Sequence, residues 1–270
     1  MTMKKKILFP TDFSPAAKNA FTYAIELAKE LGMTIDLMSI YHLPVADASS
    51  VPPDQIDRML RDKKQQVANN MGEFIKGPYQ EYISKTRIDY GVFVSAEITE
   101  AAQDNDYGLI VMGMQGEHNR MEKMMGSTTS HVMMHAPCPV LAIPENAVFS
   151  GIKNIAYATD FYPNDDMAIN QLSDLAEALH ASVHFVHVTK QEVEAPSDLQ
   201  LANAKGTFDG FSIVTNDSVQ EGLDEFIQEK DIDVLALFIP RRRLWERLFH
   251  TSFSKRMTMN TKIPLLTFHI

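Results

Sequence analysis

Residues 5–13 of this chain return in similar form at residues 153–161. The first segment reads K-K-I-L-F-P-T-D-F and the second reads K-N-I-A-Y-A-T-D-F. A second pair repeats in the same order, with A-P-C-P-V-L-A-I at residues 136–143 and T-K-I-P-L-L-T-F at residues 261–268. Matches at both ends indicate a duplication, so the chain is predicted to fold as two copies of one unit.

Each copy alternates short apolar runs with segments of helical periodicity, and we expect one domain at 1–146 and another at 147–270. The strands expected in the first copy cover residues 7–9, 35–41, 92–94, 109–112 and 140–143. Its expected helices cover residues 16–31, 55–74, 96–103 and 127–135, and the second of these ends at Phe74 or continues past Pro78. Apolar strands separated by helices predict right-handed crossovers and a parallel sheet covered on both faces. The fold class is therefore α/β, with two Rossmann-like domains in tandem.

Composition excludes several classes of function. The formal net charge of −10 argues against binding nucleic acid through a diffuse basic surface. A single cysteine, Cys138, rules out an internal disulfide and suits a reducing compartment. No stretch approaches the roughly 18 apolar residues of a spanning helix, and the apolar run behind the first lysines is too short for a signal peptide. We therefore expect a cytoplasmic protein without a membrane or nucleic-acid partner.

Glycines follow the apolar run at residues 109–112. Gly113 comes directly after it and Gly116 three positions on, and Gly126 follows after nine intervening residues, just before Ser127. Glycines that leave a buried strand and return before a helix let backbone N–H groups approach an anion closely. The helix dipole also favours a phosphate at that position. The pattern predicts a phosphate site.

Side chains near these glycines fit the same chemistry. Asp12 ends the first strand, and its carboxylate could accept hydrogen bonds from the base or sugar of a nucleotide. The hydroxyls of Ser127 and Thr128 could donate to phosphate or reach a metal ion bound to it. The alternative is that the glycines only make turns, with Ser127 as a helix N-cap.

The spacing G-x2-G-x9-G-[ST] resembles the nucleotide-binding signature of the universal stress protein family. The opening I-L-F-P-T-D-F-S at residues 7–14 and the closing H-A-P-C-P-V-L at residues 135–141 resemble that family too. The resemblance covers nearly the whole chain as two tandem family domains. It implies a five-stranded parallel sheet in each domain, of the type shared with adenine nucleotide alpha hydrolases, and ATP binding in many members. It also implies pairing through the last strands.

The resemblance assigns a nucleotide site to the first copy. It implies that the adenine lies beside the ends of the first two strands and that the phosphates lie at the glycine turn before the helix. A divalent ion, Mg²⁺ or Mn²⁺, would be bound through the phosphates, and no protein side chain is assigned as its ligand. The residues so implied are Pro10, Thr11, Asp12, Ile40, Met112, Gly113, Gly116, Gly126, Ser127 and Thr128. Glu117 follows Gly116 where the family often has a basic residue, which would weaken the hold on phosphate.

The second copy keeps Asp160 but lacks the glycines, whose positions are predicted to fall on Leu237, Pro240 and residues 250–251. Proline has no N–H to donate, and bulky side chains would occupy the phosphate space. We therefore expect one ATP per chain, in the first copy. Residues 241–243 are three arginines at the place of the missing loop, and they form either a recruited anion site or a solvated loop.

The leading hypothesis is a nucleotide-binding stress-response protein whose N-terminal domain acts as a sensor or switch. A protein-interaction scaffold that binds no nucleotide is one alternative, and a slow ATPase or phosphotransfer enzyme is another. No nucleophile–base pair can be read from the spacing, so an enzyme is the less favoured reading, with at most slow ATP hydrolysis. The edge strands at residues 140–143 and 265–268 are the predicted seam between the domains, and a homodimer stays open.

Overall fold

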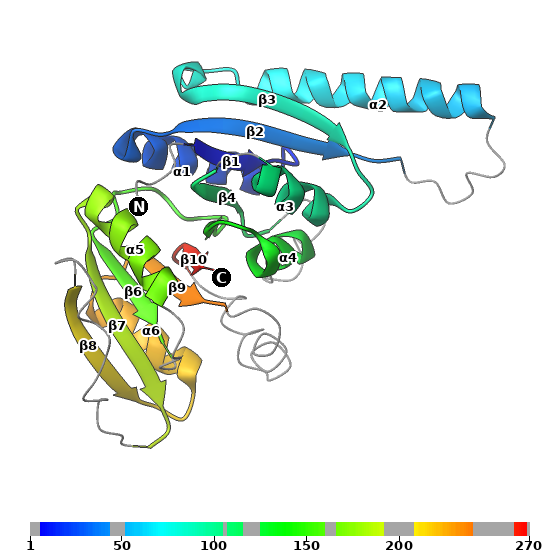
Figure 1. Cartoon of the computed structure of the whole chain (residues 1–270). Helices are drawn as coiled ribbons and strands as arrows, with labels where there is room; N and C mark the ends of the chain where they lie inside the picture. The colour runs from blue at the N-terminus through cyan, green and yellow to red at the C-terminus, as the bar shows by residue number, and fades with distance from the viewer. Residues whose placement is uncertain are drawn as a thin grey trace.

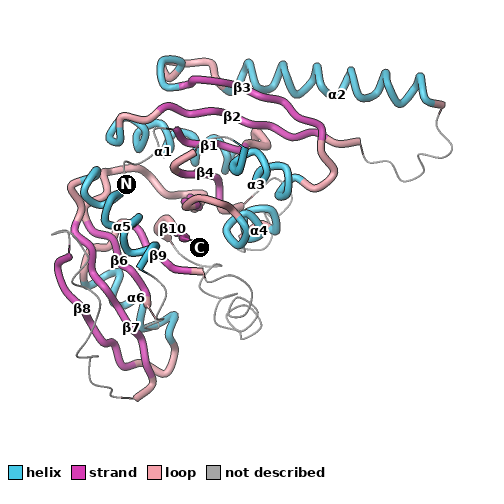
Figure 2. The backbone as a smooth tube through the Cα atoms, in the orientation of Figure 1, coloured by secondary structure: helices cyan, strands magenta, loops and turns pink. Residues whose placement is uncertain are grey.

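The computed structural model describes residues 6–43, 52–104, 107–115, 125–159, 166–191, 208–239 and 262–268. Strands and helices alternate along these residues (Figures 1 and 2). The elements are, in order, β1 (Lys6–Pro10), α1 (Pro15–Leu31), β2 (Thr34–Tyr41), α2 (Pro53–Phe74), η2 (Gln80–Tyr82), β3 (Ile83–Tyr90), α3 (Val94–Asp104), β4 (Leu109–Gly113), α4 (Ser127–His135), β5 (Val140–Ile143), β6 (Asn154–Ala158), α5 (Asp166–Leu179), β7 (Ser182–Thr189), β8 (Phe208–Thr215), α6 (Val219–Glu229), β9 (Val234–Phe238) and β10 (Leu265–Phe268).

The strands form one ten-stranded sheet in the order β3-β2-β1-β4-β5-β10-β9-β6-β7-β8. All neighbours within each half are parallel, as predicted for two five-stranded units. The halves meet where β5 pairs antiparallel with β10, with Leu141 opposite Leu266. The seam therefore lies at the predicted last strands, and it makes the two sheets continuous.

Local sequence signals set the limits of α1, which connects β1 to β2. The Ser14 hydroxyl caps the helix by accepting the Ala17 N–H at 3.1 Å, and Pro15 occupies the first turn, where its missing N–H is not needed. Gly32 ends the helix in the left-handed region, with φ of 61°. The start of α1 is thereby fixed directly beside the end of β1.

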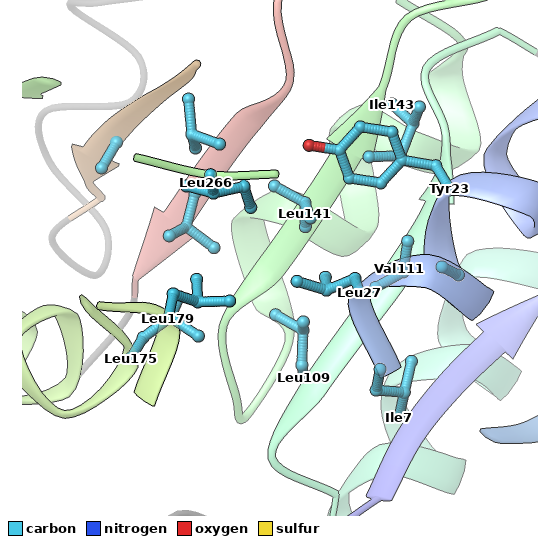
Figure 3. Packing of buried hydrophobic residues seen from close by; sticks show 14 of the residues in the cluster. Ile7, Tyr23, Leu27, Leu109, Val111, Leu141, Ile143, Leu175, Leu179 and Leu266 are labelled. Atoms are coloured by element: carbon cyan, nitrogen blue, oxygen red, sulfur yellow. The ribbon is translucent and has the colours of Figure 1, made fainter. Parts of the chain in front are cut away.

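Two apolar clusters fill the space between the sheet and its helices. Helices α1, α2 and α5 pack on one face, and α3, α4 and α6 pack on the other. The cluster on the first face crosses the seam, because side chains from α1, β4, β5, β10 and α5 meet there (Figure 3). The two halves thus share a core in addition to a pair of strands.

The third strand lies elsewhere than predicted. β3 covers Ile83–Tyr90, whereas residues 92–94 form a bend and the start of α3. β3 is an edge strand that pairs only with β2, and it carries exposed charged residues such as Lys85 in place of an apolar run. The exposed apolar pair Val92 and Phe93 therefore gave a misleading strand signal.

The end of α2 is fixed by aromatic packing. The Phe74 ring lies 5.1 Å from Phe21, 5.6 Å from Phe13 and 6.5 Å from Phe9, measured between ring centroids. The helix ends at this residue, so the alternative that it continues past Pro78 is wrong.

A buried polar pair joins β2 to the start of β4 across β1. The Tyr107 hydroxyl donates to the Asp36 carboxylate at 2.9 Å, and Lys6 Nζ lies 3.8 Å from the same oxygen. Burial, together with the hydrogen bond and the negative charge of Asp36, raises the pKa of Tyr107 well above its ordinary value. Burial also raises the pKa of Tyr23, with a further contribution from Asp233 in the second half.

We predict that Leu266→Ala lowers the free energy of unfolding by about 2–5 kcal/mol, because this nearly fully buried side chain fills the shared core at the seam. Urea unfolding of the full chain, followed by circular dichroism, measures the change. Met167→Ala is the control, since that side chain is 52% exposed, and it should change stability by less than about 0.5 kcal/mol. Equal effects of the two substitutions would contradict a shared core.

We predict that stability falls as pH rises above about 10. There the two buried tyrosines ionise in the unfolded chain while the folded state, with its raised pKa values, keeps them protonated. Each contributes a slope of up to about 1.4 kcal/mol per pH unit. Tyr107→Phe should make the fall shallower, and Tyr23→Phe should add an independent reduction. Unfolding curves between neutral and alkaline pH test this, and unchanged slopes in both variants would refute it.

Candidate functional site

The carboxyl ends of β1, β2 and β4 lie together at one edge of the sheet. β1 pairs with β2 on one side, with Pro10 opposite Met38, and with β4 on the other. The Thr11 N–H continues the pairing beyond the strand by donating to the Met38 carbonyl at 2.8 Å. In parallel sheets ligands bind outside this edge, where the chain order switches direction.

The turn after β1 holds itself in place with local hydrogen bonds. The Thr11 hydroxyl accepts the Phe13 N–H and the Asp12 carboxylate accepts the Ser14 N–H, both at 3.0 Å. Phe13 adopts a left-handed backbone with φ of 63°, which is uncommon for a residue with a side chain. Asp12 is exposed, and the turn orients one of its carboxylate oxygens toward the start of α1.

Gly113 sits where β4 passes the first turn of α1. A Cβ at this position would lie 3.5 Å from the Ala16 carbonyl group and 3.4 Å from the Gln115 carbonyl oxygen. The Gly113 carbonyl accepts the Thr129 hydroxyl of α4 at 2.9 Å. The N-termini of α1 and α4 therefore both lie next to this glycine.

Thr129 was not among the residues predicted from the sequence. It is buried, and its hydroxyl connects the first turn of α4 to the end of β4. The available signal was the run of four hydroxyl residues that begins at Ser127, of which Thr129 is the buried one.

The first turn of α4 carries the hydroxyls and N–H groups that the sequence assigns to a phosphate site. Ser127 is exposed and Thr128 is half-exposed. The Gly126 N–H donates to the Met114 carbonyl at 2.8 Å and is therefore already paired. Its role beside a phosphate stays a prediction. The following N–H groups have no acceptor within the helix, as in the first turn of any α-helix, and they remain suited to an anion.

Other predicted residues line the same edge. Pro10 and Met112 are buried at the ends of β1 and β4, and Ile40 is half-buried near the end of β2 on the face covered by α3 and α4. Gly116 lies outside the described residues. The predicted set thus converges wherever the structure describes it.

The strand register changes one comparison between the halves. Gly113 lies opposite Ile143 in β5, and Phe238 lies opposite Phe268 in β10. The counterpart of Gly113 is therefore Phe238, and the predicted match to Leu237 is off by one residue. The apolar sequences of β4 and β9 align almost equally well when shifted by one residue. The strand pairing in the structure therefore decides which residue corresponds to Gly113. A benzyl group stands in the second half where the first has only a hydrogen.

The end of β6 in the second half has the same backbone hydrogen bond as the end of β1 in the first half. The Thr159 N–H donates to the Val186 carbonyl at 3.0 Å, as Thr11 does to Met38. The ring Nδ1 of His187 lies 2.8 Å from the Thr159 carbonyl oxygen. Other predictions for this half lie outside the described residues, namely those for Asp160, Pro240, 241–243 and 250–251.

Two histidines of α4 stack on each other. The rings of His131 and His135 lie 4.2 Å apart, and His135 Nδ1 contacts the His131 carbonyl oxygen at 2.9 Å. Burial, followed by the nearby His135, lowers the pKa of His131. Within the described ranges no group of three or more His, Cys, Asp or Glu side chains could hold a metal ion.

Comparisons with known proteins agree with this architecture. The model of the universal stress protein family matches residues 3–144. Universal stress protein MJ0531 of Methanocaldococcus jannaschii is 30% identical over 144 residues, which make up 52% of this chain and 81% of the relative. Universal stress protein MJ0577 of the same organism is 26% identical over 159 residues, covering 52% of this chain and 95% of the relative.

A solved structure extends the likeness to both halves. The crystal structure of a universal stress protein from Archaeoglobus fulgidus covers 98% of this chain and 96% of its own, with a TM-score of 0.73 and 19% identity. At that identity the likeness concerns the fold alone. In the parts of the chain that the structure describes, no helix has both the length and the apolar character to cross a bilayer.

We predict that Thr129→Val lowers the free energy of unfolding by about 1 kcal/mol, because the Gly113 carbonyl loses its hydrogen bond. Amide hydrogens in the first turn of α4 should exchange faster, and hydrogen-exchange mass spectrometry checks both effects. The matched control is Thr22→Val, which removes an exposed hydroxyl that donates to the Lys18 carbonyl. Equal exchange in the two variants would show that the Thr129 hydroxyl does not hold α4 in place.

Proposed function

Because the chain belongs to the universal stress protein family, we propose that its first half binds ATP at the edge formed by β1, β2 and β4. The observation that carries the proposal is the meeting of two helix N-termini at Gly113, next to the carboxylate turn of Asp12. Helix N-termini attract phosphate through their N–H groups and their dipoles. We treat 1–146 as the nucleotide-binding domain and 147–270 as a domain with a different task.

The phosphates are proposed to lie against the first turn of α4. There Ser127 and Thr128 supply backbone N–H groups and hydroxyls on an accessible surface. Thr129 holds this turn against β4, so that the donors are in place before the ligand arrives. Gly116 and Gly126 lie between β4 and α4 in the sequence.

The adenosine is proposed to lie across the ends of β1 and β2. Ile40 is half-buried and offers apolar surface near the end of β2, while Pro10 is buried at the end of β1. The carboxylate of Asp12 can accept hydrogen bonds from the base or the ribose. Gly113 leaves room for the ribose where a side chain would intrude. A Mg²⁺ or Mn²⁺ ion would be held by the phosphates, with protein hydroxyls as its only direct neighbours from the chain.

Binding is proposed to occur once per chain. At the counterpart of Gly113 the second half carries Phe238, a half-buried side chain that packs against the first apolar cluster. A benzyl group here would take up space that Gly113 leaves open. The second half would then keep the strand pairing of the first half but have no space for a nucleotide next to Phe238. ATP would then act as a switch on one half of a cytoplasmic stress-response protein, with at most slow hydrolysis.

We predict a stoichiometry of one ATP per chain in isothermal titration calorimetry with Mg²⁺ present. Mass spectrometry of the denatured purified protein should also detect co-purified ATP. Two sites per chain would contradict the role given to Phe238. A protein that carries no nucleotide and binds none when it is added would favour an interaction scaffold.

The sharpest variant is Ser127→Asp, which places a carboxylate where the phosphates are proposed to lie. A negative charge in the first turn of a helix favours the helix, so the fold should be preserved. The affinity for ATP should fall at least tenfold, which is about 1.4 kcal/mol, and the affinity for adenosine should not change. Gln220→Glu adds the same charge to the first turn of α6 and should alter neither affinity. Unchanged ATP affinity in Ser127→Asp would exclude this placement of the phosphates.

A further inference from the structure

Helix α2 extends well past the sheet on which it packs. Its last turns lie over the first face of the sheet, and its N-terminal part continues beyond the ends of β2 and β3 (Figure 1). Val67 and Met71 are its buried residues, both in the C-terminal third. About four turns, from Pro53 to Gln66, therefore add no side chain to the described core, which normally stabilises a helix of this length.

The apolar stripe of α2 continues along the projecting part. Val67 and Met71 form the part of this stripe that is buried. Ile56 and Leu60 continue the stripe toward the N-terminus at helical spacing, and Met59 lies at its border. Met59 is 48% exposed. Among the described residues Ile56 and Leu60 are half-buried but belong to neither core cluster nor its margin. The projecting turns thus carry an apolar seam that the described core does not cover.

Charges beside the seam change sign along the helix. Asp57 lies on one flank near the N-terminal end, and Lys64 lies on the same flank two turns later, both exposed. Lys63 lies within the seam, where its aliphatic stem can cover a neighbouring leucine. In an antiparallel pair of these helices, Asp57 of each copy would lie opposite Lys64 of the other. A two-fold axis near Leu60 would relate the two copies. In a parallel copy the two Asp57 side chains would lie on opposite sides of the seam, and no Asp57–Lys64 pair would form.

We propose that the projecting part of α2 is a self-association surface that pairs antiparallel with α2 of a second copy of this chain. The pairing buries Leu60 of both copies near the axis and places two Asp57–Lys64 pairs on its flank. Isologous contacts of this kind close at a dimer and do not propagate. Because α2 lies at the far side of the first half from the β5–β10 seam, the contact leaves the paired strands intact (Figure 1).

The size of the surface predicts a weak dimer. Fourteen helical residues span about 21 Å, and a pair of such helices buries less than the roughly 800 Å² per partner of a standard stable interface. Self-association should therefore depend on concentration and weaken with added salt, because the flanking pairs are exposed to solvent. This proposal does not depend on nucleotide binding.

Sedimentation velocity of the full chain over a concentration series tests the surface. We expect a monomer–dimer equilibrium in the wild type and only monomer in Leu60→Glu, which puts a charge at the axis. Gln65→Glu adds the same charge on the opposite side of the helix and should leave the dimer unchanged. Circular dichroism confirms that each variant is folded. A wild type that stays monomeric, or a dimer unaffected by Leu60→Glu, would overturn the proposal.

Charge reversal tests the antiparallel direction. Asp57→Lys alone and Lys64→Asp alone should each weaken their own dimer about tenfold, because like charges then face each other twice. A mixture of the two variants should associate more tightly than either one, since every facing pair is opposite in sign again. No gain on mixing would rule out the antiparallel arrangement, and with it the proposed dimer.

Discussion

The antiparallel pairing of β5 with β10 is the interaction on which the rest of this molecule depends. Each half of the sheet would otherwise end in an exposed strand of continuous apolar sequence, which is a template for aggregation. The pairing covers both edges at once and brings the helices of the two halves over one apolar cluster, in which Leu27, Leu141 and Leu266 all take part. The halves therefore share one core, although each has its own sheet with the same strand order.

Because the two halves share the same strand order, the carboxyl ends of their corresponding strands can be compared residue by residue. The ends of β1 and β6 keep the same backbone hydrogen bond, from Thr11 in one half and Thr159 in the other. The ends of β4 and β9 differ, with Gly113 at one and Phe238 at the other. The pairing is thus the same in both halves, while the side chain beside it differs. We base the assignment of one nucleotide per chain on this contrast.

The sequence predicted those elements whose signals are local. Buried strands such as Val140–Ile143 carry unbroken apolar runs, and α1 is bounded by a hydroxyl cap and a glycine, so both lie where expected. β3 was missed because an edge strand needs no apolar run and carries Lys85 among exposed residues. In the site, the residue types and their spacing located the edge, but two facts required the tertiary structure. One is the hydrogen bond from Thr129 to the end of β4, and the other is the register that makes Phe238 the counterpart of Gly113.

Joining both partners of the seam in one polypeptide has a consequence for how such a protein can change. In a symmetric homodimer every substitution appears twice, so a residue that closes one binding site closes its twin as well. Here the two sides of the pseudo-symmetric sheet are encoded separately, and a phenylalanine can replace a glycine on one side while the other keeps its opening. The pairing also survives any dilution, because the partner strands cannot diffuse apart. The duplicated chain is thus free to specialise its halves while keeping the architecture of a pair.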